Sequence, residues 1–481
     1  MPSVILQNYV DGTFQPSESD TAAPHVNPSD ARDVVARVPD STPDEVHVAV
    51  DAASGALPKW RALSGQSRAE HLYRWADAVT ARGDELARAI SREVGKPISE
   101  ARGEVTRAAV ILRYAAGEAV RSVGDVIPAQ VAGSLQFTRR EPLGVVALIT
   151  PWNFPLAIPL WKAAPALAFG NTVVLKPSEL SSLVAILLAE TATAAQIPPG
   201  VFNLILGRGP AAGEALLHAE AVRAVSFTGS GAVGRIVARV AADRNIRFQT
   251  EMGGKNVVIV DRDADLDAAA ALAANGAMRY AGQKCTATSR VVLARSVESQ
   301  FVERLRASVG SLPLGPVDDP SAAVGPMITE RARASVQDAI TKGSPEALFG
   351  GVLPGDSRFH QGSYFAPLVI RFEGPDDPLA QRELFGPVLG VLVADDLEHA
   401  IDIANATPYG LSASLFTRDL RSALRYVDRI QAGMVRVNGD TTGVDPHAPF
   451  GGVKASSSGS REQGPASREF YTEIKTVQIN P

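Results

Sequence analysis

The sequence is poor in cysteine, in clustered histidine and in charge of one sign. Its 481 residues include a single cysteine, Cys285, so no disulfide can form within the chain and a reducing compartment is expected. Lys and Arg number 47 against 52 Asp and Glu, and the net charge of −5 excludes a strongly basic nucleic-acid binder. The 7 histidines are scattered, without a His-Glu-x-x-His or Cys/His motif, so we predict no catalytic metal.

The sequence also lacks a long uninterrupted apolar run. Its most apolar window, residues 142–175, is broken by prolines and contains Asn153 and Lys162. A membrane-spanning helix needs about 20 apolar residues with few interruptions, so we assign this window to the core and to a site. Residues 1–10 show no basic segment followed by an apolar one. We therefore expect no secretory signal and a cytoplasmic protein with no membrane partner.

What is present is the pattern of a large α/β protein, and the length suggests about two to four domains. Leu86, Ile90 and Val94 recur at helical spacing before Gly95, a typical C-cap, so residues 44–117 are predicted to form amphipathic helices. Beyond them, short apolar runs alternate with helical stretches, which predicts a parallel sheet covered on both faces. The expected elements are strands 145–149, 172–175, 201–206 and 222–227, helices 180–196 and 211–219, a second α/β series over 257–437 and a final strand over 470–479.

Cys285 is the first candidate for chemistry. A lone cysteine is more often an inert buried thiol, because free cysteine is among the most buried residue types. Here, however, its neighbours are Gly282, Gln283, Lys284 and Thr286 rather than an apolar run. A helix end or a lysine nearby can lower the pKa of a thiol from roughly 8.5 toward neutrality, as nucleophilic work requires.

Glu251 and Asn153 are two further candidates. Glu251 comes shortly before Gly253 and Gly254, whose lack of bulk could leave its carboxyl in a cleft to activate water. A surface glutamate in a turn is equally consistent with this context. Asn153 stands between prolines and aromatics, which suits a preorganised oxyanion donor, and it could also cap the helix that Pro155 begins. Those two roles of Asn153 are compatible.

Residues 229–234 match the G-x-G-x-x-G dinucleotide pattern, which is a weak signal alone. That pattern also needs an acid about 20 residues further on for a ribose hydroxyl, and Glu251 falls there. Glu251 cannot both hold a ribose and activate water. Lys176 and Glu179 offer a cation and an acceptor at the carboxyl end of a predicted parallel strand, where nucleotides bind in open α/β sheets. We therefore assign the ribose to them.

Seven short motifs occur in order and together resemble the aldehyde dehydrogenase superfamily over nearly the whole chain. Each motif is moderately specific alone, whereas the ordered set is very specific. The motifs are residues 151–155 (PWNFP), 176–179 (KPSE), 227–230 (FTGS), 251–255 (EMGGK), 282–285 (GQKC), 383–387 (ELFGP) and 449–454 (PFGGVK).

The resemblance implies an α/β fold with a Rossmann-like NAD(P)-binding domain, an α/β catalytic domain and a small β-rich oligomerisation arm. Such an arm joins subunits into homodimers or homotetramers. The implied boundaries are 1–121 and 141–252 for the NAD(P)-binding domain, 253–436 for the catalytic domain, 122–140 and 455–481 for the arm, and 437–454 for a connecting active-site loop.

The resemblance also implies roles in NAD(P)-dependent oxidation of a small-molecule aldehyde. Cys285 is the expected nucleophile, Asn153 and the Cys285 backbone N–H the oxyanion donors, and Glu251 the base that activates water. A glutamate at this position favours hydrolysis over transfer of the acyl group to coenzyme A. The expected cofactor-binding residues are Lys176, Ser178, Glu179, Thr150, Pro151, Trp152, Phe227, Gly229, Ser230, Gly253, Glu383 and Phe385.

Cofactor and substrate choice follow from details of these motifs. Glu179 favours NAD, because a carboxylate repels the 2′-phosphate of NADP, although a glutamate that swings aside admits both. Residues 443–464 are similar to the 2-oxoglutarate semialdehyde (2,5-dioxovalerate) dehydrogenase branch of the family. Such a substrate needs a cation at the tunnel, for which Arg279 and Arg436 are candidates, and either could equally be solvated or structural. The expected substrate residues are Phe154, Ile158, Trp161, Thr286, Arg279, Arg436 and Phe450.

Three alternatives stay open at this point. An apolar tunnel would suit a broad-specificity aliphatic or aromatic aldehyde dehydrogenase. A member that passes the acyl group to coenzyme A or phosphate is a second alternative, and a catalytically silent relative is the third.

Overall fold

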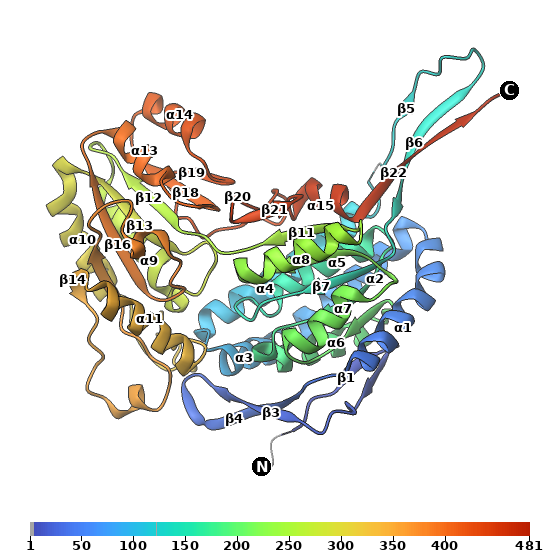
Figure 1. Cartoon of the computed structure of the whole chain (residues 1–481), viewed down its shortest axis with the longest axis horizontal. Coiled ribbons are helices and arrows are strands. Elements are labelled where there is room, and N and C mark those ends of the chain that lie inside the picture. Colours follow the sequence, from blue (N-terminus) through green and yellow to red (C-terminus); the bar gives the residue numbers. More distant parts are fainter. Residues whose placement is uncertain (1–3, 122) are drawn as a thin grey trace.

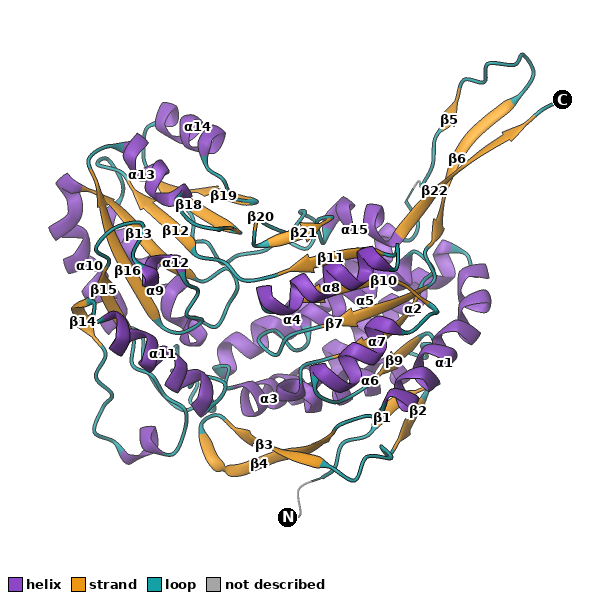
Figure 2. Cartoon of the chain, in the orientation of Figure 1, coloured by secondary structure: helices purple, strands orange, loops and turns teal. Residues whose placement is uncertain are grey.

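The structure is a computed structural model that describes residues 4–121 and 123–481. Two large sheets form the body, and a small sheet projects from it as an arm that carries the C-terminus (Figure 1). Helices accompany both large sheets (Figure 2). The first sheet has the strand order β2-β1-β9-β8-β7-β10-β11-β21 and the second β14-β15-β16-β13-β12-β18-β19. This arrangement confirms the α/β class expected from the sequence.

The first sheet is parallel at its centre and buried on both faces. Val146 and Leu148 belong to one core cluster, whereas Val145 and Ala147 belong to another, as the alternation of side chains along a strand requires. The parallel strands are β7 (Val145–Ile149), β8 (Thr172–Lys176), β9 (Phe202–Leu204), β10 (Val222–Thr228) and β11 (Arg247–Glu251), and β1 (Asn8–Val10), β2 (Thr13–Gln15) and β21 (Ser457–Gly459) form antiparallel edges.

The N-terminal helices form as the sequence predicts. Thr42 and Glu45 make a reciprocal capping box at the start of the first helix, and Gly95 ends the third in the left-handed conformation (φ 73°). Within the described ranges, no helix is both long and apolar enough to cross a membrane. The helices are α1 (Pro43–Ala62), α2 (Gly65–Ala81), α3 (Gly83–Val94), α4 (Ile98–Glu118), α5 (Ala157–Ala168), α6 (Ser182–Ala194), α7 (Glu214–His218) and α8 (Gly231–Asp243), with short turns η1 (Glu179–Ser181) and η2 (Gly209–Gly213) before α6 and α7.

The second sheet has its own core, built on apolar strands and small-residue helices. Its strands are β12 (Asn256–Val260), β13 (Thr288–Ala294), β14 (Glu346–Gly350), β15 (Leu368–Arg371), β16 (Val388–Ala394), β18 (Ser412–Phe416) and β19 (Met434–Val437). Its helices and turns are α9 (Leu266–Met278), η3 (Arg279–Gly282), η4 (Arg295–Val297), α10 (Glu298–Gly310), α11 (Glu330–Gly343), η5 (Ser357–His360), α12 (Pro378–Gln381), α13 (Leu397–Asn405) and α14 (Leu420–Arg429).

The arm is a three-stranded antiparallel sheet of β5 (Val126–Ile127), β6 (Leu135–Pro142) and β22 (Thr472–Ile479). The final strand, expected over residues 470–479, begins two residues later, at Thr472 of β22, because α15 (Gly464–Tyr471) occupies the preceding segment. That helix packs on α5 and β11, so part of residues 455–481 lies against the body. The domain boundaries as such stay a prediction. Two antiparallel strand pairs complete the fold. β3 (Ala22–Asn27) forms a hairpin with β4 (Asp30–Pro39), and β17 (Tyr409–Gly410) pairs with β20 (Val453–Lys454), which is distant in sequence.

Candidate active site

Cys285 lies in the loop between η3 and β13, next to a strained turn. Tyr280 and Ala281 have positive φ values of 55° and 50°. Non-glycine residues persist in this conformation only where the surrounding structure holds them. Part of that hold comes from Asn256 at the start of β12, whose Nδ2 donates to the carbonyl oxygen of Cys285 at 2.8 Å.

The Cys285 thiol lines a cavity of about 320 Å³, which is at the small end of the usual range for ligand pockets. Burial raises the pKa of this thiol to about 12, and the carboxylates of Glu383 and Glu251 add to the effect. The sequence context suggested instead that a neighbouring lysine could lower the pKa of the thiol. Lys284 does not act that way because its ammonium is paired with Glu100 at 2.9 Å. The thiol is therefore protonated at neutral pH in this state.

Asn153 follows β7 and reaches the loop that carries Cys285. Its Nδ2 donates to the carbonyl oxygen of Gln283 at 3.1 Å, and its buried Oδ1 has no partner within the described ranges. The alternative role as a helix cap is not seen, because α5 begins only at Ala157 and makes no side-chain cap bond. One of the two N–H bonds of the Asn153 amide thus stays available to a ligand.

Glu251 ends β11, where the antiparallel strand β21 runs beside it. Its Oε2 accepts a hydrogen bond from Ser457 Oγ at 2.5 Å, whereas Oε1 is buried without a partner within residues 4–121 and 123–481. Burial raises the pKa of Glu251 well above its usual value, and the nearby Glu462 adds to the shift. Glu462 is itself buried against Lys162. The alternative of a surface glutamate in a turn is therefore wrong, and Glu251 is a buried titratable carboxyl.

The residues expected at the cofactor gather where parallel strands of the first sheet end. Thr150, Pro151 and Trp152 follow β7, and Phe227, Gly229 and Ser230 lie where β10 leads into α8. Ser230 caps that helix by accepting from Val233 N. Three others end β8 or follow it at η1: Lys176, Ser178 and Glu179.

Lys176 has the environment of a ligand-binding cation. Its side chain is buried, and burial lowers its pKa although Glu179 and Asp40 oppose the shift. No carboxylate lies within ion-pairing distance of it in the described part of the chain. A buried ammonium without an ion pair fits a ligand that brings oxygen atoms, such as the hydroxyls of a ribose.

The remaining cofactor candidates meet where the two sheets face each other. Glu383 Oε1 accepts from Gly254 N at 3.2 Å, and a Cβ on Gly253 would collide with the Glu383 carboxylate. Burial raises the pKa of Glu383 to about 7, which the Gly254 N–H and Lys255 oppose. The rings of Trp152 and Phe385 contact edge to face at 5.6 Å. The Phe385 segment therefore contacts the end of β7 through Trp152, and Glu383 lies against the segment that follows β11.

The expected substrate residues divide into two groups. Phe154, Trp161, Thr286 and Phe450 line the cavity of Cys285, whereas Ile158 is fully buried and does not. Neither expected arginine lines it. Arg279 binds Asn275 and Glu100, and Arg436 binds Asp440.

Sequence reasoning missed the side of the cavity formed by α4. Its residues there recur at helical spacing, but their pattern looks like that of any amphipathic helix. Thr442, Gly443 and Val444 also line the cavity, and they belong to the loop 437–454 that the resemblance places at the active site. The missed lining residues are Ser99, Glu100, Gly103, Glu104 and Arg107 from α4, with Lys284.

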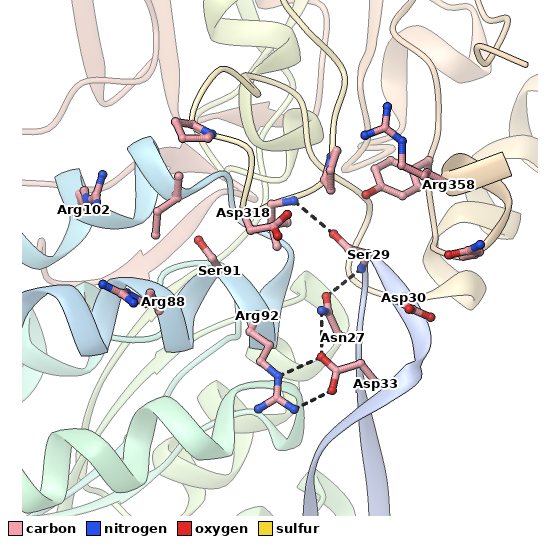
Figure 3. Close-up of a pocket in the computed structure, with 16 residues that line it drawn as sticks. Asn27, Ser29, Asp30, Asp33, Arg88, Ser91, Arg92, Arg102, Asp318 and Arg358 are labelled. Atoms are coloured by element: carbon pink, nitrogen blue, oxygen red, sulfur yellow. Dashed lines mark hydrogen bonds and ion pairs between the residues drawn. The ribbon is translucent and has the colours of Figure 1, made fainter. Parts of the chain in front are cut away.

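A larger cavity of about 860 Å³ lies elsewhere, between the β3–β4 pair, α3 and the segment around residue 317 (Figure 3). Three of its four arginines have acidic partners: Arg92 with Asp33 at 2.6 Å, Arg102 with Asp84 at 3.4 Å and Arg358 with Asp356 at 2.8 Å. None of the expected site residues lines it. No group of three or more His, Cys, Asp or Glu side chains in the described part of the chain could hold a metal ion.

Comparison with known proteins agrees with the motifs. The model of the "Aldehyde dehydrogenase family" matches residues 14–477. The alpha-ketoglutaric semialdehyde dehydrogenase of Bacillus subtilis (strain 168) is 43% identical over 477 residues, and that of Haloferax volcanii is 41% identical over 475 residues; both alignments cover 98% of each chain. The structure of an NAD-dependent aldehyde dehydrogenase from Sinorhizobium meliloti has a TM-score of 0.96 at 38% identity, covering 99% of this chain and 95% of that one. On sequence and on structure, the chain belongs to the aldehyde dehydrogenase family.

Proposed function

We propose that this enzyme oxidises an aldehyde to the carboxylic acid with NAD, through a thioester on Cys285 that water hydrolyses. The observation that carries the proposal is the arrangement around the only thiol of the chain. Cys285 lines a cavity, Asn153 is bonded to the loop that holds it, and two buried carboxyls act on its pKa. Nucleophile, oxyanion donor and base are the three groups that this reaction needs.

In the first half of the reaction the sulfur of Cys285 attacks the aldehyde carbon. The thiol proton must leave as the S–C bond forms, and we assign its acceptance to the carboxylate of Glu383, which acts on the thiol, so that Glu251 stays available for the second half. The resulting oxyanion receives hydrogen bonds from Asn153 Nδ2 and the Cys285 backbone N–H, worth about 3–4 kcal/mol per donor in comparable sites. NAD, when bound, supplies the hydride acceptor that turns the tetrahedral adduct into a thioester.

In the second half Glu251 activates the water that hydrolyses the thioester. Burial raises the pKa of Glu251, so its carboxylate holds a proton more strongly than an exposed glutamate does, as a general base must. The buried Oε1 atom has no hydrogen-bond partner in the described ranges, so it would be the acceptor for a water admitted to the site. Hydrolysis releases the acid and regenerates the thiol of Cys285. Because Glu251 activates the water for this step, its presence favours hydrolysis over acyl transfer to coenzyme A.

NAD fits the strip of residues along the ends of β7, β8 and β10. Lys176 and Glu179 would hold the adenosine ribose, with Ser178 beside them, and the start of α8 at Ser230 would face the pyrophosphate. Glu383 would hold the nicotinamide ribose. The Glu179 carboxylate favours the 2′-hydroxyl of NAD over the 2′-phosphate of NADP. The structural relative from Sinorhizobium meliloti is likewise described as NAD-dependent.

The proposed substrate is a semialdehyde that carries a carboxylate, such as 2-oxoglutarate semialdehyde. Support comes from the two curated relatives, which are named for that activity and match this chain over nearly its full length. A broad-specificity aliphatic or aromatic aldehyde dehydrogenase is the second candidate, because Phe154, Trp161 and Phe450 give the cavity aromatic walls.

We also propose that the arm joins two copies of the chain, as a homodimer or as part of a homotetramer. Val126, Ile474 and Ile479 expose 78%, 60% and 54% of their surface on the arm sheet. Exposed apolar groups of this size on a projecting sheet mark an interaction surface. The edge strand β19 offers unpaired backbone groups that a strand of another copy could bind.

A screen of aldehydes tests the proposed function directly. Reduced cofactor would be followed at 340 nm with succinic, glutaric and 2-oxoglutaric semialdehydes, hexanal and benzaldehyde, each with NAD and with NADP. We expect the highest kcat/KM with a carboxylated semialdehyde and NAD, and free acid as the product even when coenzyme A is added. Equal rates with hexanal would support the broad-specificity candidate, and an acyl-CoA product would contradict hydrolysis.

The bond from Ser457 to Glu251 makes a prediction about pH. A hydrogen bond to a carboxylate stabilises its charged form, so Ser457→Ala should raise the pKa of Glu251 further. Because the ionised form is the base, activity is present above this pKa and is lost as pH falls through it. The acid limb of the kcat profile should therefore move up by about one pH unit.

Ser458→Ala is the matched control for that prediction. Ser458 lies beside Ser457 on β21, but its hydroxyl bonds Thr250 at 2.7 Å. The acid limb of the kcat profile of Ser458→Ala should coincide with that of the unmodified enzyme. An unchanged limb in Ser457→Ala would mean that a group other than Glu251 limits the reaction on the acid side.

A further inference from the structure

The cavity of Cys285 contains one cation whose charge nothing balances. Helix α4 turns one face toward it, with Glu100, Glu104 and Arg107 at intervals of about one turn. Lys284 lines the same space from the Cys285 loop. The cavity wall thus holds two carboxylates and two cations. Any of these groups that has no ion-pair partner is available to interact with a charged substrate.

Both carboxylates, those of Glu100 and Glu104, already form ion pairs. Glu100 is paired with Lys284 at 2.9 Å and with Arg279 at 3.3 Å. Burial opposes ionisation of Glu100, but the cations outweigh it and lower its pKa to about 2. Glu104 is buried against Lys96, and it also accepts from the backbone N–H groups at the start of α5. Lys284 is therefore also occupied.

Arg107 is the cation that stays unbalanced. Its guanidinium donates to the carbonyl oxygen of Val444, a neutral acceptor on the opposite wall. No carboxylate pairs with it in the described ranges, so four of the five N–H donors of the guanidinium stay available. Trp161 and Phe450 supply the apolar surface of the same cavity. The cavity therefore combines an aromatic wall with paired charges and one unneutralised positive charge.

We propose that Arg107 determines substrate specificity by binding the carboxylate at the far end of the aldehyde. The inference rests on the proposed function, and it names the residue that distinguishes a carboxylated aldehyde from a neutral one. A planar guanidinium suits a carboxylate because it can donate two parallel hydrogen bonds. The bond to Val444 holds the side chain in place, which reduces the entropy that substrate binding costs.

The test compares two aldehydes of equal chain length, succinic semialdehyde and butanal. Arg107→Gln should lower kcat/KM for succinic semialdehyde about 10- to 100-fold, since a hydrogen-bonded charge pair is lost. The value for butanal should change less than about threefold. Arg107→Lys keeps the positive charge but loses the planar guanidinium. Its kcat/KM for succinic semialdehyde should therefore lie between the values of Arg107→Gln and the unmodified enzyme. Glutarate, as a dead-end dicarboxylate, should inhibit Arg107→Gln more weakly than the unmodified enzyme.

Arg102→Gln is the matched control on the same helix. Arg102 lies near Asp84 at 3.4 Å, outside this cavity, and both substrates should behave as in the unmodified enzyme. Equal losses for succinic semialdehyde and butanal in Arg107→Gln would overturn the inference and make Arg107 a structural residue. A preference for succinic semialdehyde that survives in Arg107→Gln would overturn it too, while leaving the proposed substrate class intact. An unmodified enzyme without that preference would overturn the proposed substrate class and the inference together.

Discussion

Replacing Cys285 by alanine should abolish aldehyde-dependent NADH formation, with a loss of at least about 10⁴-fold in kcat. The chain has no second thiol that could take over the attack. The cofactor site should persist, because the residues assigned to it lie at or after the ends of β7, β8, β10 and β11 or in the segment before β16, and none of them lies on the Cys285 loop. NAD binding measured by protein fluorescence is therefore the control for folding. Retained turnover would remove the thiol from the mechanism.

The raised pKa of the Cys285 thiol should be visible in the pH dependence of its alkylation rate. Only the thiolate reacts with iodoacetamide, and burial with Glu383 and Glu251 raises the pKa of Cys285 to about 12. The rate should thus be low at pH 7 in the free enzyme and rise with pH up to the highest values the fold tolerates. Labelling should reach one group per chain and be absent in Cys285→Ala.

Exchanging Glu251 for glutamine should separate the two halves of the reaction. Glutamine has the same shape and can still accept from Ser457, but it cannot take a proton from water. We expect one equivalent of NADH per active site in a rapid burst, followed by a steady rate lowered about 10²- to 10⁴-fold. Stopped-flow absorbance at 340 nm measures both phases. If the burst disappears as well, Glu251 acts before the oxidation step.

The first sheet could be predicted from sequence because its parallel strands are buried on both faces. Such strands are continuous apolar runs, as in residues 145–149 and 172–175, and the groups that bind ligands follow at their carboxyl ends. Asn153 and Lys176 were found by this logic. The polar strand β21 was not, because residues 457–459 have no strand propensity and pair only through the edge of β11.

The α4 side of the substrate cavity could not be predicted for a different reason. Arg107 is far from Cys285 along the chain, and helical periodicity does not say which surface a helix will meet. Arg279 is one of the two candidates, with Arg436, that the sequence offers for this cation. Its side chain instead turns to Asn275 and Glu100, since a nearby acceptor and a carboxylate satisfy it locally.

The acylation of one sulfur atom is the central claim, and the mass of the enzyme measures it most directly. The Glu251→Gln variant would be mixed with aldehyde and NAD, quenched in acid after the burst, digested and analysed by mass spectrometry. We predict that the peptide containing Cys285 gains the mass of the acyl group, in an amount equal to the NADH formed. An unmodified Cys285 peptide despite a full NADH burst, or an acyl group on another residue, would contradict the account.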